Sequence, residues 1–481
     1  MRKSVLNLMA KQVVATAMGN KAVLLLMWLV VALMVYATIT GVATFRTQTG
    51  IRKQFQQEVR KHWEEMPDKH PHRMAHYGYI AFRAKHPLSI FDFGVESYTG
   101  NAVFLEAHKQ NSVNFSEASF STGLLRFGEM SMATILQVLV PLVLFFIGFG
   151  LIATDRENGT LKLLLSQGAS WKEIMTGRSL GLMVVAFTFL LAALLLLLTG
   201  MIVSSAGFTL DGSLRLLFLM LTYGLYLAII CVTAVVVSAV AARARAALAG
   251  LIGVWLLFAI VLPRTTQAIG TYLYPAPSRI AFETGVEKNI LQLGDSHNPD
   301  DPYFKRLKDS VLKVHGATSI EELPFNYAGF QMREGERMSS EVYNRHQQAL
   351  LRTYEQQNKV ARLSAFLNPF AAVKHLSMAM SGTDFQSYMR FQQQTEAYRY
   401  RLAQHMNELQ IKLVSNKKLL PADKPYSISS AHWKAFPDFS YQGLTGAAAI
   451  GAEALSLAAL LFWAALLTVL VSSLSKKLKA V

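Results

Sequence analysis

DRENGTLKLLLSQGASWKEIMTGR, residues 155–178, lies between two long apolar runs that contain no charged side chain. Its first part is a charged turn followed by a short leucine-rich helix, which Gly168 ends. Ser170 and Glu173 then have the spacing of a capping box, so a second helix begins there. A brief amphipathic helix between two apolar runs is typical of a loop on one face of a membrane. The stretch predicts a membrane protein with a short loop that a soluble partner can push.

The composition agrees with a membrane protein. The 481 residues are 52% hydrophobic and 16% charged, with a mean hydropathy of +0.28, whereas a soluble domain has about 25% charged residues. The net charge of +16 suggests nucleic acid, but much of the lysine and arginine lies beside the apolar runs, where positive charge orients membrane spans. We therefore expect a lipid membrane, and no nucleic acid, as partner. The single cysteine, Cys231, excludes an internal disulfide.

Six apolar runs are long enough to cross a hydrocarbon core, which takes about 20 helical residues. Residues 22–45 are too long for the apolar part of a cleaved signal peptide, about 7–15 residues, so the first span should be retained. Residues 1–21 before it have the apolar spacing of an interfacial helix. The predicted spans are residues 22–45, 131–154, 179–210, 216–242, 246–263 and 443–475, the third to fifth lying within 179–263.

Positive charge predicts the orientation. Lysine and arginine cluster before the first span, in the loop 155–178, between the fourth and fifth spans, and in the tail 476–481. If six spans alternate, all four clusters lie on one side, which should be cytoplasmic. We expect a multi-pass protein of the bacterial cytoplasmic (inner) membrane with both termini cytoplasmic. The clusters are Arg2, Lys3, Lys11 and Lys21; Arg156, Lys162, Lys172 and Arg178; Arg243 and Arg245; and Lys476, Lys477 and Lys479.

Two large segments, residues 46–130 and 264–442, are then extracytoplasmic. The first combines a predicted helix at 50–65 with short apolar stretches and many turn residues, which indicates a small mixed domain. The second should be long and helical. The predicted fold class is therefore mainly α: a polytopic membrane protein with six transmembrane helices and two extracytoplasmic insertions.

Start and stop residues divide the second segment into helices. Asp301 and Pro302 should begin a helix that Gly316 ends, and Ser319 has capping-box spacing to Glu322. Two helices of about 30 residues would each be roughly 45 Å long, which predicts a helical stalk. The further predicted helices are residues 334–367, residues 370–380 up to Gly382, and one from a Thr383 cap to about Val414.

The stretch ENGTLKLLLSQGASWKEIMTGRSLG resembles the loop of ABC-2 type transporter permeases. In that family an acidic residue, Gly-Thr-Leu and a leucine pair precede a small-residue turn, although proline often stands where this chain has Gln167-Gly168. The resemblance implies a coupling helix that a separate ATP-binding-cassette ATPase subunit receives, with Ser170 and Glu173 opening the next helix. The matching residues are Glu157, Gly159, Thr160, Leu161, Leu164 and Leu165.

The resemblance also implies a function. The chain would be the permease subunit of an exporter, paired with a second permease, with ATP and Mg²⁺ bound by the ATPase subunit and no cofactor of its own. No Walker A sequence, H-E-x-x-H or G-x-S-x-G is found, so we do not expect an enzyme. HPHRMAHYG, LEAHKQN and LSAFLNPFAAVKHLSMAMSGTDF resemble a subgroup with a large uncharacterised extracytoplasmic domain, linked to multicopper-enzyme maturation.

Two features leave alternatives open. His70, His72 and His76 have spacings at which imidazoles could hold copper or zinc, which would make the chain a membrane metalloprotein. However, no cysteine or methionine cluster accompanies them and Pro71 interrupts the geometry, so structural histidines are the other interpretation. Glu453 lies inside the last run, where a carboxylate costs at least about 2–3 kcal/mol unless it is paired or hydrated. It could line a substrate path, bind a proton, pair with a cation such as Arg264, or be interfacial.

Two functions compete. In the first, ATP-driven displacement of the coupling helix moves a cargo between two permeases. In the second, mechanotransmission, the large outer segments act on an extracytoplasmic partner and nothing crosses the lipid. In both, Leu164→Asp should abolish coupling to the ATPase while insertion stays intact, because it charges the expected docking face.

Overall fold

The computed structural model describes residues 1–107, 109–110, 130–418 and 425–478. Within these ranges, six helical segments are long and apolar enough to cross a membrane. This confirms the predicted mainly α, polytopic membrane fold. The segments are Lys21–Glu65, Met132–Glu157, Trp171–Val203, Leu210–Val240, Ala244–Leu273 and Ala454–Lys477.

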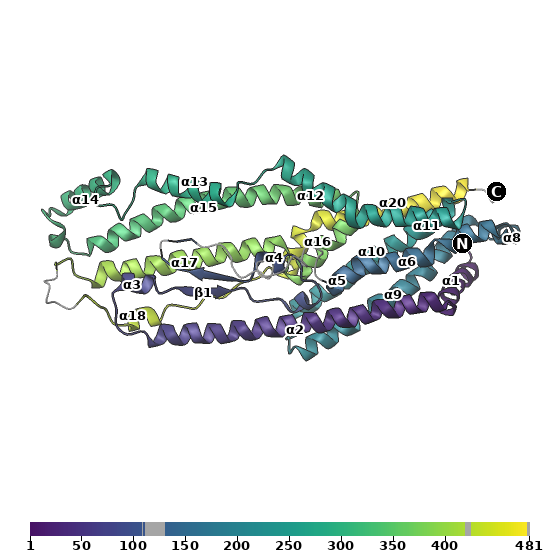
Figure 1. The fold of residues 1–481 in the computed structure, drawn as a ribbon, viewed down its shortest axis with the longest axis horizontal. Helices are drawn as coiled ribbons and strands as arrows, with labels where there is room; N and C mark the ends of the chain where they lie inside the picture. Colours follow the sequence, from purple (N-terminus) through teal and green to yellow (C-terminus); the bar gives the residue numbers. More distant parts are fainter. Residues whose placement is uncertain (108, 111–129, 419–424, 479–481) are drawn as a thin grey trace.

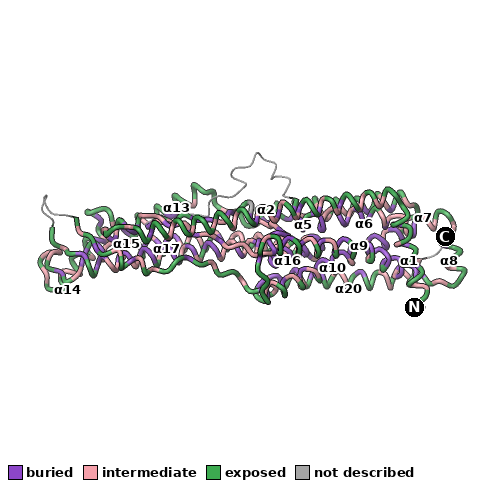
Figure 2. Tube along the Cα trace, turned by 90° about the horizontal axis from the view of Figure 1, so that it is seen from below, coloured by how far each residue is buried: buried purple, intermediate pink, exposed green. Residues whose placement is uncertain are grey.

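The molecule is elongated, and both termini lie at the same end (Figure 1). We call this the terminal end; it also holds α1 (Lys3–Gly19) and α8 (Thr160–Ser166). The opposite end is built by the two insertions, and we call it the distal domain. Figure 2 shows that buried residues run through the middle of the molecule along its whole length.

The first span belongs to a helix longer than predicted. α2 (Lys21–Glu65) continues for 45 residues, where the sequence predicts a span at 22–45 and a separate helix from residue 50. Gly50 does not interrupt it, because glycine costs a helix only about 1 kcal/mol and no proline follows. At 1.5 Å per residue α2 is roughly 68 Å long. It therefore joins the terminal end directly to the distal domain (Figure 1).

The second and fifth spans each contain a π-helical turn. α5 (Met132–Thr134), η4 (Ile135–Leu139), α6 (Val140–Gly148) and α7 (Gly150–Glu157) form the second span. α11 (Ala244–Leu256), η5 (Leu257–Val261) and α12 (Leu262–Leu273) form the fifth, which ends later than the predicted residue 263. Pro141 and Pro263 lie just after the two π turns. Because proline has no N–H to donate to the usual helical hydrogen bond, it favours a local change of helix type.

The remaining spans are α9 (Trp171–Val203), α10 (Leu210–Val240) and α20 (Ala454–Lys477). The predicted last span, 443–475, is divided: α19 (Gly446–Ala452) ends at Glu453 and α20 starts after it. α9 and α10 contribute the largest part of the membrane core, which includes Leu182, Phe189, Tyr223 and Cys231. The helices α2, α11, α12 and α20 lie around them and are mostly exposed.

The distal domain contains a small antiparallel sheet and a set of helices. β1 (Tyr79–Phe82) pairs with β2 (Ala102–Leu105), with Tyr79 opposite Leu105. The first insertion adds α3 (Pro71–Ala75), η1 (Pro87–Ile90) and α4 (Glu96–Thr99). The second contributes α13 (Arg279–Leu293), α14 (Pro302–His315), η6 (Ile320–Glu322), α15 (Tyr327–Ser364), α16 (Pro369–Ser381), α17 (Phe385–Leu413) and α18 (Ala431–Lys434).

The two insertions fold together. Met74 and Val103 of the first share one hydrophobic core with Phe391, Met406 and Trp433 of the second. We predicted residues 46–130 and 264–442 as separate domains from the sequence. Their apolar residues lie roughly 300 positions apart in the chain, so the spacing does not show that they share a core. Residues 111–129 of the first insertion lie outside the described residues.

Two predicted helix caps are wrong. Ser319 does not cap with Glu322; instead Glu322 accepts hydrogen bonds from the N–H (2.7 Å) and hydroxyl (2.9 Å) of Thr318. The N-cap of α17 is Asp384 and not Thr383. The carboxylate of Asp384 accepts a hydrogen bond from the Ser387 N–H at 3.3 Å. In both places the residue one position away from the predicted cap makes the hydrogen bonds. The helix from Pro302 to Gly316 is confirmed.

Candidate functional site

The loop at the terminal end has the local structure that its sequence predicts. Gly159 (φ +77°) and Gly168 (φ +84°) take left-handed conformations on either side of α8, which a side chain would oppose. Ser170 and Glu173 form the predicted capping box at the start of α9. α8 therefore is a single short helix held between two glycine turns.

α8 has a buried and an exposed face. Leu161 is 1% exposed, and Leu164 and Leu165 pack beside it against a cluster that includes Trp171 and Ile174. Leu163, by contrast, is 63% exposed. We call the exposed residues the α8 contact face: Lys162, Leu163, Ser166 and Gln167.

The docking role of Leu164 stays a prediction, and the structure shows that Leu164 is half-buried whereas Leu163 is exposed. The sequence pattern does not tell which side of a seven-residue helix faces the core. Leu164 and Leu165 point toward α9 and α10, so they hold α8 in place, and Leu163 is the leucine that a partner can reach. Glu157, just before Gly159, is also exposed, while Thr160 is half-buried.

Arg2 fastens the loop to the N-terminal helix. Its backbone N–H donates to Glu173 at 2.7 Å, and its guanidinium donates to both carboxylate oxygens of Glu173, at 3.1 and 2.8 Å. The same guanidinium donates to the carbonyl oxygen of Gly168 at 2.5 Å. From the sequence, Arg2 was expected only to help orient the first span in the membrane. Its contact with Glu173 could not be predicted because the two residues lie far apart in the chain.

Two more arginines join the loop to the spans. Arg178 pairs with Asp155, and Arg156 donates to the carbonyl oxygens of Ala239 (2.7 Å) and Ala241 at the end of α10. Arg156 also lies 5.8 Å from the ring centre of Trp171. A displacement of α8 would therefore act on α1, α9 and α10 together.

The carboxylate of Glu453, which lies just before the last candidate span, is paired across the fold. Glu453 accepts from Arg362 Nη2 at 2.6 Å and Nε at 2.9 Å, and from the Ser456 hydroxyl at 2.8 Å. Arg264, the cation named from the sequence, is not the partner. Arg362 lies at the end of α15, so the pair links the distal domain to the break before α20.

A cavity of about 280 Å³ lies beside this pair. Burial, with Lys374 and Arg362 nearby, lowers the pKa of His375 to about 3, so this ring is neutral at physiological pH. Burial also raises the pKa of Asp384. The cavity therefore offers the neutral ring of His375 next to an ion pair, and Glu355, Asn358 and Asp384 complete its polar wall.

The histidine cluster has structural contacts. His70 Nδ1 accepts from the N–H of His72 at 3.3 Å and caps α3, and the rings of His72 and His76 meet edge to face at 4.7 Å. Among residues 1–107, 109–110, 130–418 and 425–478, no three His, Cys, Asp or Glu side chains gather at metal-binding distance. The arrangement therefore gives no support to a copper or zinc site; His108 lies outside the described residues.

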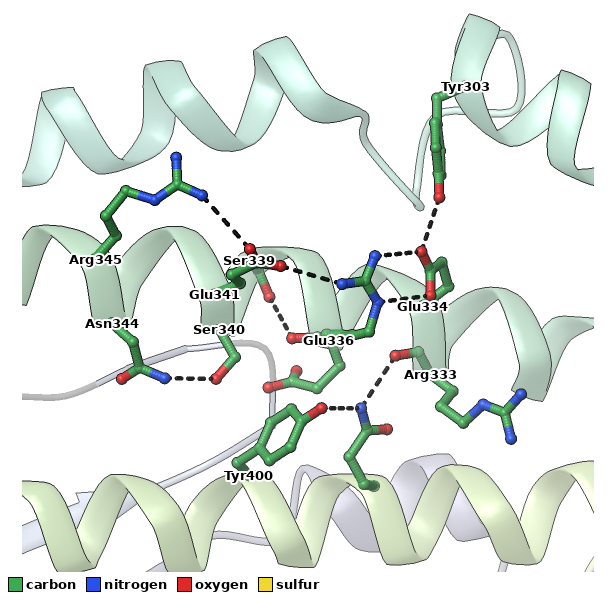
Figure 3. Close-up of polar contacts among 12 residues, drawn as sticks. Tyr303, Arg333, Glu334, Glu336, Ser339, Ser340, Glu341, Asn344, Arg345 and Tyr400 are labelled. Atoms are coloured by element: carbon green, nitrogen blue, oxygen red, sulfur yellow. Dashed lines mark hydrogen bonds and ion pairs between the residues drawn. The ribbon is translucent and has the colours of Figure 1, made fainter.

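A polar cleft of about 560 Å³ lies between α15 and α17. Figure 3 shows part of its wall: Asn344 donates to Ser340, and Glu341 lies between Arg345 and the guanidinium of Arg337. The cleft is also lined by Gln347, Gln348, Gln392, Gln393, Glu396 and Tyr400. Its amide-rich surface suits a polar partner of the distal domain.

Residues 279–442 match a protein family described as a domain of unknown function (DUF3526). The match begins with α13 and ends just before α19, so it covers the second insertion, including the polar cleft. A comparison with curated proteins finds no match to this chain. The matched family covers most of the second insertion, from residue 279 on, and its description names no activity.

Proposed function

We propose that the chain is the permease subunit of an ABC-2 type transporter, an exporter of the bacterial inner membrane with both termini cytoplasmic. The observation that carries the proposal is the α8 contact face. It presents an exposed leucine on a helix that packs against α9 and α10, and arginine contacts of the flanking residues tie the same loop to the N-terminal segment and to α10. A cytoplasmic ATP-binding-cassette ATPase, which binds ATP and Mg²⁺, would press on this face. The several kcal/mol available from nucleotide binding and hydrolysis can invert a two-state equilibrium of the spans.

A second permease would pair along the fifth span. Apolar residues are exposed at the end of the fifth span and just beyond it: Tyr272 is 85% exposed, Leu273 54% and Ile280 77%. Exposed apolar surface of this kind marks an interaction site. A copy of this chain or a related permease would cover it, and a cargo path would run between the two.

Mechanotransmission is the second candidate, and the continuity of α2 favours it. One rigid helix joins the terminal end to the distal domain, and the Arg362–Glu453 pair gives a second connection. The polar cleft would then receive an extracytoplasmic partner. Reconstitution of the purified complex distinguishes the two functions: ATP-driven flux of a labelled cargo supports export, and ATPase activity without flux supports mechanotransmission.

Both candidate functions require the ATPase to bind the α8 contact face, and Leu163→Asp tests this contact. A carboxylate on the α8 contact face should reduce the ATPase activity that co-purifies with the tagged full chain by at least about tenfold, since an apolar anchor is replaced by a charge. Insertion into the membrane should be unchanged because Leu163 is exposed. Lys172→Asp is the matched control: it places the same carboxylate at the terminal end, on α9 and off the contact face. Equal ATPase recovery from both variants would count against the coupling role of α8.

A further inference from the structure

A pocket of about 330 Å³ lies between α2 and the small sheet, outside the contacts used above. Figure 1 shows β1 lying along α2 at this point. Residues three or four apart share one face of a helix, and alternate residues share one face of a strand, so each element turns one set of side chains toward the pocket. These sets include Gln48, Ile51, Arg52 and Phe55 of α2 and Ile80 and Phe82 of β1.

The wall formed by these residues is largely apolar. Ile51 and Phe55 are 46% and 42% exposed, although they lie beyond the apolar run 22–45 of α2. The ring centres of Phe55 and Phe82 are 6.3 Å apart, so they form an aromatic pair across the two elements. The volume is at the lower end for a small-molecule site, about 300–1,000 Å³. The pocket therefore suits a small ligand with an apolar body, and an aromatic body best.

Three cations line the same pocket. Arg83 Nη2 and Lys85 Nζ share one carboxylate, Glu96, at 2.6 and 2.9 Å, while Arg52 is half-buried and makes no ion pair with any described residue. Arg83 is only 3% exposed, yet its Nη1 has no hydrogen-bond acceptor among the described residues. No carboxylate lines the pocket in the described part of the chain. Positive charge therefore exceeds negative charge here, which favours an anion.

The apolar wall and the excess positive charge together define the ligand. An inorganic anion would have to lose its water against apolar side chains that cannot replace its hydrogen bonds, which is unfavourable. A wholly apolar ligand would remove water from Arg52 without giving the guanidinium a partner, which is also unfavourable. A ligand with one negative group and an apolar body avoids both costs, because a charge-assisted hydrogen bond replaces the water at Arg52.

We propose that this pocket binds a small organic anion with an aromatic body, of the aryl carboxylate class. Its carboxylate would accept hydrogen bonds from Arg52, in the positive field of Arg83 and Lys85, and its ring would contact Ile51 and Phe55. The planar guanidinium matches the two oxygens of a carboxylate, which favours this acid group. The site is separate from the α8 contact face, so the proposal does not depend on the function proposed above.

The test uses the full chain in phosphatidylcholine nanodiscs and two photoreactive probes, benzophenone carboxylate and its neutral carboxamide. Illumination followed by peptide mass spectrometry should place the carboxylate on α2 and β1, at residues 48–55 and 80–82. An excess of benzoate should compete for this labelling. The carboxamide should label the same residues about tenfold less, because it cannot form the charge-assisted contact.

Three variants separate the charge from the apolar wall. Arg52→Gln should reduce labelling by the carboxylate about tenfold, as expected for the loss of one charge-assisted contact. Lys53→Gln is the matched control and should leave the labelling unchanged, because Lys53 is exposed on the same helix and does not line the pocket. Ile51→Ser should weaken the labelling through the loss of an apolar contact. Ile51 is exposed, so this variant tests the site even if Arg52→Gln lowers the thermal stability of the chain.

Three outcomes would overturn the proposal. Equal labelling by the carboxylate and the carboxamide would show an apolar pocket that does not recognise charge. Equal loss of labelling in Arg52→Gln and Lys53→Gln would show a general effect of surface charge. Competition by inorganic phosphate as effective as that by benzoate, with no effect of Ile51→Ser, would show an anion site to which the apolar wall contributes nothing.

Discussion

Among the described residues, several buried charges are paired with residues from a distant part of the chain. Arg399 of α17 pairs with Glu336 of α15 at 2.7 Å, and both side chains are almost fully buried. Arg215, at the start of α10, pairs with Asp211 and donates to the carbonyl oxygens of Ala379 and Met380 in α16. The spacing of Asp211 and Arg215 is visible in the sequence, but the contacts of Arg399 with Glu336 and of Arg215 with α16 are not, because those partners lie in other helices.

At the Glu453–Arg362 pair, replacing one charged side chain should lower the stability of the fold more than replacing both. Arg362→Gln should lower stability by about 3 kcal/mol, since the buried carboxylate of Glu453 then has no cation, and Glu453→Gln should lower it less because Arg362 is 23% exposed. The double variant should lose less than the sum of the two, as a double-mutant cycle by thermal unfolding in detergent would measure.

The exposed pair Arg279–Glu283 is the matched control, with side chains 85% and 58% exposed. Glu283→Gln should change stability by less than about 0.5 kcal/mol. Additive effects of Glu453→Gln and Arg362→Gln would show that the two side chains are not coupled.

His86 should make stability depend on pH. Burial, with Arg215 nearby, lowers the pKa of His86 to about 4, whereas Asp211 acts weakly in the opposite direction. Its Nδ1 also accepts from the N–H of Leu88 at 3.2 Å and caps η1. The unfolded chain takes up a proton below about pH 6.5 and the folded chain does not, so stability present above that pH is lost as the pH falls toward 4. The loss is on the order of 3 kcal/mol over this window.

His86→Asn keeps a capping oxygen and cannot take up the proton. Its melting temperature should therefore fall less than that of the natural chain between about pH 7 and about pH 5. Part of the decrease should remain, because the pKa values of His70 and His375 are lowered too. Identical pH dependence in the two proteins would contradict the role of His86.

At the scale of elements, close helix packing depends on small residues. α1 crosses α9 where Gly177 and Gly181 lie, and a Cβ on Gly181 would come within 2.6 Å of the Ala10 carbonyl oxygen and 2.7 Å of Val13. The two glycines form the G-x-x-x-G pattern of close helix contacts in membranes. Met9, Val13 and other apolar residues of α1 are buried in this contact. The sequence predicts the interfacial helix, and the structure shows that it lies against α9.

Gly181→Val should push α1 off α9 and weaken the Arg2–Glu173 contact at the end of the same helix. Hydrogen exchange of the α1 amides should rise by at least about tenfold, because a side chain in this contact cannot be accommodated without moving the backbone. Gly253→Val is the control: nothing lies within 4 Å of its added Cβ. Unchanged exchange in Gly181→Val would show that the contact tolerates a larger separation.

At the scale of the whole molecule, the two ends are connected by continuous helix and by a shared core. α2 leaves the membrane and enters the distal core, where the indole N–H of Trp63 donates to the carbonyl oxygen of Trp433 at 3.0 Å. Arg60 donates to the carbonyl oxygen of Lys434 at 2.8 Å. Movement of α2 at the terminal end would therefore displace the distal domain as one body.

Thr47→Pro should interrupt α2 between the terminal end and the distal domain, so that movement of one end is no longer passed along this helix to the other. Thr47 is exposed, just beyond the apolar run, and proline inside a helix removes a hydrogen bond and costs about 3 kcal/mol or more. ATPase activity of the purified complex should persist, while ATP-dependent changes in hydrogen exchange of the distal domain should be lost. Thr47→Ala controls for the loss of the threonine side chain. A distal response that survives in Thr47→Pro would show that α2 does not carry the movement.

The sequence alone determined the membrane fold, the short loop and a few helix limits, such as those of the helix from Pro302 to Gly316. Long apolar runs, glycine turns and the Ser170–Glu173 box act over a few neighbouring residues, so their spacing is visible in the chain. Only the tertiary structure decided which leucine of α8 is exposed, which cation holds Glu453, and that the two insertions share a core. Each of these depends on contacts between residues far apart in the chain, and linear spacing contains no information on which distant helix lies opposite.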